Sequence, residues 1–554
     1  MSEKIGIYVC ECGPNIASKV DIEKIMDEIS KLEDFKDKEL VVKKHKLLCS
    51  NEGKEFLEKE INENKLTHLV CAACSPRDHD TTFINVCKKT QLNPYLYRIV
   101  NIREHCAWII PDKDEATRKA IQYIHAGMNR VLYQDSLFEK ELDSNPDVLI
   151  IGAGIAGMEA ALNLAGEKRK VFLIEKEENI GGKAAFLPEQ NIVRQKISDI
   201  QKNKNIKVFM KTILDKLIGF MGNFEIVLKS TEKPDETTEL LAGAVVVATG
   251  YDFFDSKKLP AFKFEDKDDV INSLDAERIF SENKKITLKN GKEPKSVTMV
   301  HCVGRKQVGF CSKICCDYLL KISNYLKEQS ANIKVTHLIK YLNLPYKNSQ
   351  NFYNKIKGKG VEFIRYSDLF MNGIKVEYTD INGKKGKLES DLVILAPAMI
   401  ASKDSGELAE LLNIDLHETG YFQEVHQKTN PVSATTDGIF IIGSARGPAN
   451  IIDAMQQAKA ATGKIFTQLI PGEKIIPEVM VSEILEAYCT GCQTCLQVCG
   501  YDAIYFDDER GISVVNEAIC RGCGNCVGSC PSGSIRTRHF TNPQLYQEVK
   551  EAIR

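Results

Sequence analysis

Two cysteine runs near the C-terminal end of this 554-residue chain share one spacing, C-x2-C-x2-C-x3-C. Pro531 follows the second run. In this pattern the first three cysteines of one run and the last cysteine of the other ligate the same [4Fe–4S] cube. We therefore expect one cube on Cys489, Cys492, Cys495 and Cys530, and a second on Cys520, Cys523, Cys526 and Cys499. A chain that carries two such cubes moves single electrons.

The composition and charge of the chain exclude several classes of function. The net charge is −2 and 27% of residues are charged, so no strong field attracts nucleic acid or an anionic membrane. The sequence contains no run of about 18 apolar residues, so we expect no membrane span. An apolar strand is expected at residues 5–10, and we therefore expect no signal peptide. The 19 cysteines indicate metal binding rather than disulfides, and we expect a reducing, cytoplasmic and anaerobic compartment.

A glycine-rich segment predicts a dinucleotide site. Residues 148–157 combine an apolar strand, G-x-G-x-x-G and the start of a helix. Gly152 permits the tight turn, Gly154 lets the backbone approach a pyrophosphate, and Gly157 lets the helix pack on the strand. Glu175 ends the next strand and is expected to accept hydrogen bonds from the adenosine ribose.

Later segments favour FAD over NAD. Gly182 and Lys183 follow the acidic strand, residues 245–250 resemble a second FAD motif, and residues 435–443 resemble a third. Ser444 stands where aspartate is usual, and an ordinary strand-end turn at 248–250 is the alternative. Lys183 is also a candidate for tuning the flavin. The expected FAD-binding residues are Gly152, Ala153, Gly154, Ala156, Gly157, Glu175, Lys176, Gly182, Lys183, Ala248, Thr249, Gly250, Gly443 and Ser444.

The second nucleotide-binding region lacks its nucleotide motif. After the strand at 296–303 the sequence continues Gly304-Arg-Lys-Gln-Val-Gly309, which is not G-x-G-x-x-G. We expect a [4Fe–4S] cluster in place of the nicotinamide nucleotide, so NAD(P)H would not be the donor at this site. Buried core thiols or a redox disulfide are the alternatives. The cysteines concerned are Cys302, Cys311, Cys315 and Cys316.

Seven cysteines remain in the N-terminal region. Several end strands or lie in turns, where thiolates are exposed, and we favour one further cluster on Cys10, Cys12, Cys49 and Cys74. Cys71 is the main rival ligand, because it forms a C-x2-C motif with Cys74 and this spacing suits a cube. Cys71 could equally face the core from within its strand. Cys87 and Cys106 are expected to be core thiols.

Taken in order, these motifs resemble those of the A subunit of heterodisulfide reductase. The resemblance is carried by residues 9–16, 73–79, 152–157, 301–316 and 443–448 and by the ferredoxin-like C-terminal region. It implies a cluster on the cysteines of 302–316, another in the N-terminal domain, and FAD in a thioredoxin-reductase-like core. Full-length members carry a second ferredoxin inserted after the position of Lys183, whereas residues 186–193 run straight on here without cysteines.

The expected fold class is α/β, with a two-dinucleotide-binding flavoprotein core between an N-terminal α/β Fe–S domain and a C-terminal α+β ferredoxin domain of two clusters. The expected domains are 1–145 (N-terminal Fe–S), 146–290 (first FAD half), 291–400 (degenerate Rossmann with a cluster), 401–475 (return FAD half), 476–540 (ferredoxin) and 541–554 (C-terminal tail).

The leading hypothesis is an oxidoreductase component with FAD and four [4Fe–4S] clusters that performs flavin-based electron bifurcation or confurcation. The alternative is a non-bifurcating relay and assembly scaffold. An independent disulfide reductase is disfavoured, because the C-x-x-C at 71–74 lies outside the flavoprotein core. The expected partners are heterodisulfide reductase B/C-like subunits, a hydrogenase or formate-dehydrogenase-type donor, ferredoxin and a second copy of the chain; neither nucleic acid nor a membrane span is expected.

Overall fold

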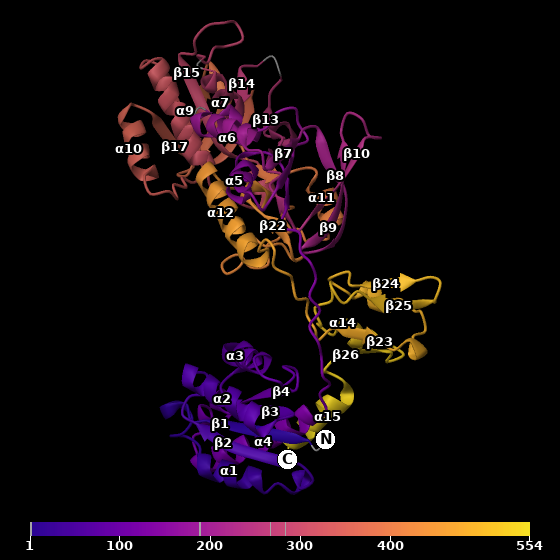
Figure 1. Cartoon of the computed structure of the whole chain (residues 1–554). Coiled ribbons are helices and arrows are strands. Elements are labelled where there is room, and N and C mark those ends of the chain that lie inside the picture. The colour runs from indigo at the N-terminus through magenta and orange to yellow at the C-terminus, as the bar shows by residue number, and fades with distance from the viewer. Residues whose placement is uncertain (1–2, 188–189, 266–267, 283, 554) are drawn as a thin grey trace. The chain divides into compact units, whose positions relative to one another are not determined.

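The computed structural model describes residues 3–187, 190–265, 268–282 and 284–553. The chain forms two compact units (Figure 1). Unit 1 combines residues 1–142 with residues 476–554, and unit 2 comprises residues 143–475.

The N-terminal part of unit 1 is a parallel sheet flanked by helices. The strand order is β2–β1–β3–β4, so β1 is central and pairs with both β2 and β3. All six residues of β3 are buried, as expected for a parallel strand covered on both faces. The elements are β1 (Lys4–Cys10), α1 (Ile22–Ser30), β2 (Glu39–His45), α2 (Asn51–Asn64), β3 (His68–Ala73), α3 (Pro76–Lys88), β4 (Tyr97–Asn101), a π-helix (Arg103–Ala107) and α4 (Lys113–Leu132).

Serine caps fix where two of these helices begin. The Ser50 side chain accepts from the backbone N–H of Gly53 at the start of α2. The Ser75 side chain accepts from Arg77 at the start of α3, where Pro76 occupies the first turn. Each serine directly follows a predicted ligand, Cys49 or Cys74, so both thiols lie beside a helix N-terminus.

The C-terminal part of unit 1 is built from short elements. Two antiparallel pairs, β23 with β26 and β24 with β25, flank the two short helices that carry cysteines. The elements are β23 (Ser482–Ile484), α13 (Thr494–Gln497), β24 (Ile504–Asp507), β25 (Ile512–Val515), α14 (Asn525–Ser529) and β26 (Ile535–Thr537).

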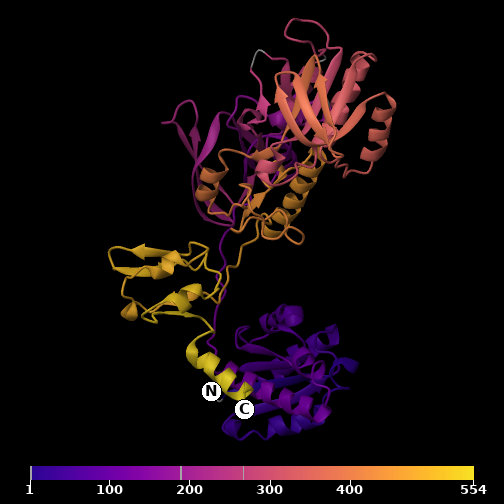
Figure 2. The same ribbon diagram turned by 180° about the vertical axis from the view of Figure 1, so that it is seen from behind.

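The last helix, α15 (Asn542–Ala552), packs on α4, and both views show it along the N-terminal domain (Figures 1 and 2). A capping box of Thr541 and Gln544 starts the helix. Arg130 of α4 is almost fully buried, donates to the His539 carbonyl and pairs with Glu548 at 3.1 Å. The sequence predicts only a weak helical pattern here, whereas the structure forms a docked helix.

The FAD-type half of unit 2 is a parallel sheet in the order β22–β11–β5–β6–β7. Its strands are short and apolar, and β5 and β11 are buried throughout. The elements are β5 (Val148–Ile151), α5 (Ile155–Leu164), β6 (Val171–Ile174), α6 (Gln190–Lys202), β7 (Ile206–Phe209), the antiparallel set β8 (Thr212–Phe220), β9 (Asn223–Ser230) and β10 (Thr237–Ala242), then β11 (Ala244–Val247), α11 (Ser405–Leu412), β22 (Ile439–Ile441) and α12 (Ile451–Gln468).

The second half of unit 2 has the sheet order β14–β20–β15–β16–β17–β18–β19, with β13 pairing β17. Helices α9 and α10 lie beside this sheet (Figure 1). The elements are β12 (Tyr251–Phe253), β13 (Phe262–Lys263), β14 (Val270–Asn272), α7 (Ser273–Ser281), β15 (Ser296–Val303), α8 (Arg305–Val308), α9 (Cys315–Gln329), β16 (Lys334–Ile339), α10 (Ser349–Gly358), β17 (Glu362–Asn372), β18 (Lys375–Asp380), β19 (Lys385–Glu389), β20 (Leu392–Pro397) and β21 (Met399–Ala401).

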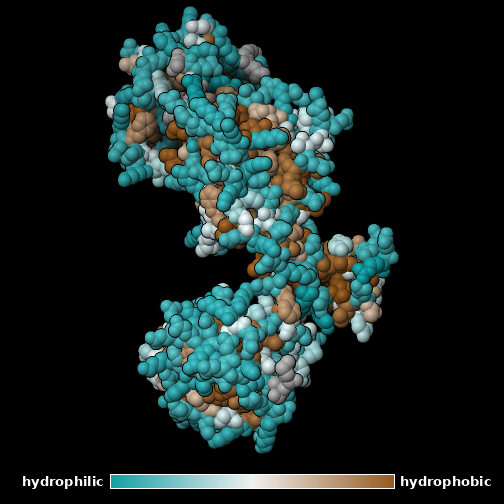
Figure 3. Space-filling view, viewed as in Figure 1, coloured by the Kyte–Doolittle hydropathy of each residue, from teal (hydrophilic) through white to brown (hydrophobic). Residues whose placement is uncertain are grey.

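The surface of the N-terminal domain is mostly hydrophilic in the view of Figure 3, with scattered hydrophobic residues. Among the described residues, no helix combines the length and apolar character needed to cross a bilayer.

Candidate functional site

The glycine turn after β5 has the geometry of a phosphate cradle. Gly152 has a φ of +102°, and a Cβ there would lie 2.5 Å from the Ala248 carbonyl oxygen. A Cβ on Gly157 would lie 1.9 Å from the Gly152 oxygen, so only glycine lets α5 start this close to β5. A Cβ on Gly154, in contrast, would meet no atom within 4 Å. The open space beside Gly154, at the N-terminus of α5, therefore fits an approaching phosphate.

The loop after β6 closes against the same turn. Gly154 and Gly181 form a parallel bridge, and a Cβ on Gly182 would lie 3.1 Å from the Gly154 Cα. The Glu175 carboxylate is buried and accepts backbone N–H bonds from Ala153 at 2.8 Å and from Glu177 at 3.1 Å. Each carboxylate oxygen keeps a further lone pair for a ribose hydroxyl.

The two lysines of the expected FAD set are paired with protein groups. Lys176 forms an ion pair with Asp404. Lys183 donates to the Tyr251 carbonyl oxygen, lies 3.4 Å from Asp252 and sits over the Tyr251 ring at 5.0 Å. The structure thus holds the Lys183 ammonium at the start of β12.

The remaining FAD-motif residues end β11 and β22. Ala248 is buried, its N–H bonds to Ile151, and Gly250 has a φ of +79°. Ala156 packs against Gly443, where a Cβ would lie 2.8 Å from its methyl group. The Ser444 hydroxyl lies 3.4 Å from the Ala449 carbonyl oxygen, and the Gly443 N–H bonds to the Gln457 side chain at 2.8 Å.

Three buried polar atoms near these motifs have no hydrogen-bond partner within the described residues: Thr249 Oγ1, Tyr421 Oη and Arg446 Nε. Unpaired buried polar groups are costly, so such atoms point to a ligand that completes their hydrogen bonds. Together with the open cradle at Gly154, they fit a bound dinucleotide.

An open cavity of about 650 Å³ lies beside residues 446–448 and the first turns of α12. Arg446 and Tyr421 line it, and so does Cys311 of the second half of unit 2. Glu424 also lines the cavity and lies 3.6 Å from the Arg446 guanidinium. One cavity therefore meets both the segment that directly follows the last FAD motif and a predicted cluster ligand.

The structure brings the four cysteines of 302–316 together. The charges of Cys302, Cys311 and Cys316 all act on Cys315, whose thiol donates to the Cys316 sulfur. That hydrogen bond raises the pKa of Cys315 and lowers the pKa of Cys316. Cys302 lies at an irregularity of β15 and has a φ of +58°, which turns it out of the strand's alternation. We name this set the core quartet: Cys302, Cys311, Cys315 and Cys316.

Hydrogen-bond donors surround the core quartet. The Asn343 backbone N–H donates to Cys316 at 3.4 Å, and its side-chain amide lies 3.7 Å from Cys311. The Lys313 N–H donates to Cys311 at 3.4 Å. Arg305 donates to Cys302, although burial raises the pKa of that thiol. Thiolates held by four such donors fit a [4Fe–4S] cube.

The N-terminal quartet, Cys10, Cys12, Cys49 and Cys74, lies where adjacent parallel strands end. Cys10 ends β1, Cys49 precedes α2, Cys74 follows β3, and Cys12 has a φ of +40° in the turn after β1. Cys12 and Cys49 act electrostatically on Cys10, and Cys49 acts on Cys74. Burial raises the pKa of Cys74 to about 12, so cluster binding there would release a proton.

The other N-terminal cysteines are core thiols. Cys71, Cys87 and Cys106 are each fully buried, and Cys71 lies within β3 facing Cys87. Sequence reasoning missed Arg103, whose charge acts on Cys49 and Cys74. It lies 2.7 Å from Asp78 and over the Trp108 ring at 4.9 Å.

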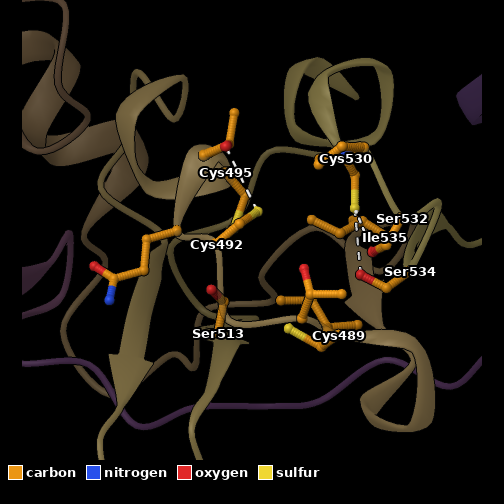
Figure 4. A pocket seen from close by; sticks show the side chains of 13 residues that line it. Cys489, Cys492, Cys495, Ser513, Cys530, Ser532, Ser534 and Ile535 are labelled. Atoms are coloured by element: carbon orange, nitrogen blue, oxygen red, sulfur yellow. Dashed lines mark hydrogen bonds between the residues drawn. The ribbon is translucent and has the colours of Figure 1, made fainter.

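One C-terminal pocket is lined by Cys489, Cys492, Cys495 and Cys530 (Figure 4). These thiols come from both runs, in the combination that the spacing predicts. Ser532 and Ser534 lie 3.5 and 3.3 Å from the Cys530 sulfur. Burial tends to raise the pKa of Cys530, but these hydrogen bonds outweigh it and lower the pKa to about 7.

The cysteines expected to hold the second C-terminal cube also lie close together. Cys520, Cys499 and Cys523 act electrostatically on Cys526, and burial raises the pKa of Cys526. The Ser482 hydroxyl lies 3.4 Å from the Cys526 sulfur, and the Ala503 N–H donates to Cys499 at 3.3 Å.

Comparisons with known proteins agree with this architecture. Residues 146–458 match the pyridine nucleotide-disulphide oxidoreductase family, and residues 482–545 match a 4Fe-4S dicluster domain. An iron-sulfur A subunit of the CoB–CoM heterodisulfide reductase of Methanopyrus kandleri is 29% identical over 658 residues, covering 99% of this chain and 98% of that protein. The A subunit of the ferredoxin:CoB-CoM heterodisulfide reductase of Methanosarcina mazei is 30% identical over 651 residues, and the alignment covers 99% of this chain and 81% of that protein. A thioredoxin reductase structure from T. acidophilum covers 58% of this chain and 99% of its own at 18% identity and a TM-score of 0.40.

The dinucleotide cradle, the cysteine sets and these matches define an iron–sulfur flavoprotein that holds FAD and 4Fe-4S clusters and transfers electrons. The predicted fold class is confirmed, with a flavoprotein core and a C-terminal dicluster domain. The chain belongs to the family of heterodisulfide reductase A subunits, as its motifs predict.

Proposed function

We propose that this chain is the FAD- and [4Fe–4S]-containing electron-transfer component of a heterodisulfide-reductase-like complex that performs flavin-based electron bifurcation or confurcation. FAD would supply the conversion between paired and single electrons. The observation that carries the proposal is the cavity shared by Cys311 and residues 446–448, which directly follow the last FAD motif. A cysteine of the core quartet at this cavity favours exchange of single electrons over hydride transfer.

Four clusters are proposed. The N-terminal and core quartets would each hold one cube, and the C-terminal runs would hold two. Burial keeps Cys10, Cys74 and Cys302 protonated in the free protein, because it raises the pKa of each thiol. Cluster insertion would therefore release protons at both quartets.

Charged residues of the cavity are the proposed tuners of the flavin. Arg446 carries a buried Nε without a partner among the described residues, and Glu424 lies beside its guanidinium. Lys313 lines the same cavity. Lys183, in contrast, is held by the Tyr251 carbonyl oxygen and Asp252. We therefore favour Arg446 over Lys183 as the residue that sets the charge near the ring.

The names of relatives suggest the partners. One relative is the A subunit of the H(2)/formate:CoB-CoM heterodisulfide,ferredoxin reductase of Methanococcus maripaludis, 29% identical over 98% of this chain. By analogy, we propose B/C-like subunits, a hydrogenase or formate-dehydrogenase-type donor and ferredoxin as partners. A second copy of the chain within the complex is part of the same proposal.

A non-bifurcating relay is the second candidate. The alignment with the Methanopyrus kandleri relative spans 658 residues, whereas this chain has 554. The relative therefore contains residues that this chain lacks, in keeping with the missing inserted ferredoxin. Without the electron route through an inserted ferredoxin, the chain would pass electrons between two partners of similar potential.

The deciding experiment is an anaerobic count of iron, sulfide and flavin, followed by reduction with a two-electron donor in the presence of two acceptors of widely different potential. About sixteen irons per FAD and equal reduction of both acceptors would support four cubes and bifurcation. Reduction of the high-potential acceptor alone would establish the relay. About eight irons would leave only the C-terminal pair and overturn the proposed count.

A further inference from the structure

A buried chain of hydrogen bonds leads away from the core quartet. Cys316 Sγ lies 3.7 Å from His301 Nδ1, and His301 Nε2 lies 2.8 Å from His337 Nδ1. His337 Nε2 lies 2.6 Å from Ser323 Oγ. The two histidines and the serine are completely buried, and Cys316 is 2% exposed. The chain crosses three elements, since His301 belongs to β15, His337 to β16, and both Cys316 and Ser323 to α9.

The surroundings hold the two rings in place. The His337 ring stacks on Phe363 with centroids 4.6 Å apart, and the two imidazoles lie 5.1 Å apart. The Tyr366 hydroxyl donates to the His301 carbonyl oxygen at 3.0 Å. The distance from His301 to Cys316 is therefore set by packing on both sides of the sheet.

Hydrogen-bond chemistry fixes the direction of the chain once Cys316 is a cluster ligand. A bound thiolate carries no proton and can only accept, while a neutral imidazole donates through one nitrogen and accepts through the other. Burial lowers the pKa of His337, so this ring is neutral. His301 then donates Nδ1–H to sulfur and accepts at Nε2 from His337, and His337 accepts at Nε2 from the Ser323 hydroxyl.

The opposite direction is unfavourable. Ser323 can also donate to the Leu319 carbonyl oxygen at 2.9 Å, and His337 would then donate to the serine. In that arrangement a neutral His301 would turn a lone pair toward the negatively charged sulfur. Such a contact between buried groups is repulsive.

We propose that His301, held by His337 and Ser323, donates a hydrogen bond to the Cys316 sulfur and raises the reduction potential of the cluster at the core quartet. The proposal rests on the proposed function only in requiring a cluster at these four cysteines. Reduction adds negative charge to the cluster and its sulfurs, so an N–H donor stabilises the reduced form more than the oxidised form. His301 is thus a positioning and tuning residue that acts through Cys316.

Two isosteric variants separate the two ring nitrogens. The amide nitrogen of His301→Asn falls near the position of Nδ1 and can still donate to sulfur. The amide nitrogen of His301→Gln falls near Nε2, so it retains the contact with His337 and loses the donor to sulfur. Ser323→Ala removes the hydroxyl at the far end. Tyr366→Phe is the control, because the Tyr366 hydroxyl bonds to the His301 carbonyl oxygen and lies near Cys302 but does not contact the His301 ring.

The experiment is an anaerobic redox titration followed by EPR on the complete, cluster-loaded chain. The signal of the core cluster is identified as the one that Cys315→Ser abolishes. We expect His301→Gln to shift the oxidised-to-reduced ratio about tenfold toward oxidised at fixed ambient potential, about 59 mV for a one-electron couple. Ser323→Ala should shift it less in the same direction, and His301→Asn and Tyr366→Phe should stay near the wild type.

An unchanged potential in His301→Gln, or an equal shift in Tyr366→Phe, would overturn the tuning role and leave the proposed function standing. Should His301→Gln lose the cluster, Ser323→Ala decides alone, and an unshifted potential there would overturn the proposal. If the wild type has no signal that depends on Cys315, the cluster assignment itself fails, and the tuning role fails with it.

Discussion

The Tyr346 hydroxyl donates a hydrogen bond to the Asp453 carboxylate at 2.9 Å, and this bond joins the two halves of unit 2. Tyr346 lies between β16 and α10, in the half that carries the core quartet. Asp453 lies in the first turn of α12, and it also lines the cavity beside Cys311. The bond therefore holds one wall of the proposed flavin cavity against the half that bears the cluster cysteines.

Removing the Tyr346 hydroxyl is expected to loosen this contact. Burial and the neighbouring carboxylate raise the pKa of Tyr346, so the hydroxyl stays a donor at any physiological pH. Tyr346→Phe should lower the free energy of unfolding by about 1.5 kcal/mol, as for a hydrogen bond to a charged group. Hydrogen exchange of the first turn of α12 should also become faster.

The matched control is Tyr353→Phe. The Tyr353 ring packs on Phe363, and within the described part of the chain its hydroxyl makes no hydrogen bond. Urea unfolding of both variants compares the loss of the bond with the loss of a hydroxyl alone. Equal stability of the two variants would show that the Tyr346 bond does not couple the halves.

Three glycine-to-alanine changes separate folding from FAD binding. In Gly154→Ala the new methyl group meets no protein atom within 4 Å, so the fold should survive and the methyl should obstruct the phosphates. In Gly157→Ala the methyl would lie 1.9 Å from the Gly152 oxygen, so α5 cannot pack and both stability and FAD should be lost. Gly463→Ala, at an open position of α12, is the control.

The measurement is the FAD released per polypeptide on denaturation, together with the thermal midpoint of the apoprotein. Gly154→Ala should retain its thermal midpoint and lose at least tenfold in FAD affinity. Full FAD retention in Gly154→Ala would mean that the phosphates do not approach this glycine.

Local spacing explains which parts of the site could be predicted. The C-terminal cysteines, the core quartet and the first FAD glycines each lie within short segments whose spacing directly reflects geometry. Arg446 belongs to the motif at 443–448, but its place at the cavity, like that of Tyr421, depends on how β22 and α12 return to the sheet. His301 and His337 lie on neighbouring strands, and only the pairing of β15 with β16 brings them together.

The docking of α15 could not be predicted for a related reason. Arg130 and the His539 carbonyl oxygen are far apart in the sequence, and nothing near either residue marks the other. The hydrophobic periodicity of residues 542–552 is weak because the buried positions of this helix are the polar Gln544 and Glu551, whereas Leu545 and Val549 are exposed. Its partner surface on α4 appears only in the folded structure.

The Glu159 ion-pair cluster should make the stability of unit 2 depend on pH. Glu159 of α5 is almost completely buried, bonds to Lys196 of α6 and lies 3.6 Å from Lys459 of α12. Burial tends to raise the pKa of Glu159, but the hydrogen bonds of Lys196 and Asn163 and the two positive charges outweigh it, so the pKa is lowered. A lowered folded-state pKa stabilises the fold above the unfolded value of 4.5, and this contribution is lost as pH falls through the folded value.

Glu159→Gln is therefore expected to cost about 2 kcal/mol at pH 7 and progressively less below pH 4.5. Urea unfolding of wild type and variant across this range measures the difference. Glu167→Gln is the control, since Glu167 is exposed and forms no ion pair among the described residues. A stability gap that stays constant from pH 7 to pH 3.5 would contradict the coupling to ionisation.

The exchange of fourth ligands between the two C-terminal runs can be tested by combining cysteine variants. Cys489 and Cys530 line one pocket although they belong to different runs, whereas Cys526 lies with Cys499. Each of Cys489→Ser, Cys530→Ser and Cys526→Ser should remove about four irons. The double variant of Cys489 and Cys530 should lose no more than either single change, because both would ligate one cube.

The double variant of Cys530 and Cys526 should instead lose about eight irons, because its changes fall on different cubes. Iron analysis and EPR of the five proteins, with flavin content as the control for folding, measure these losses. If ligation followed the runs in sequence, the pattern would reverse, with the Cys530 and Cys526 pair losing about four irons and the Cys489 and Cys530 pair about eight. The pocket that gathers Cys530 with the first run favours the exchanged arrangement, since three of its cysteines come from residues 489–495 and the fourth from the end of α14.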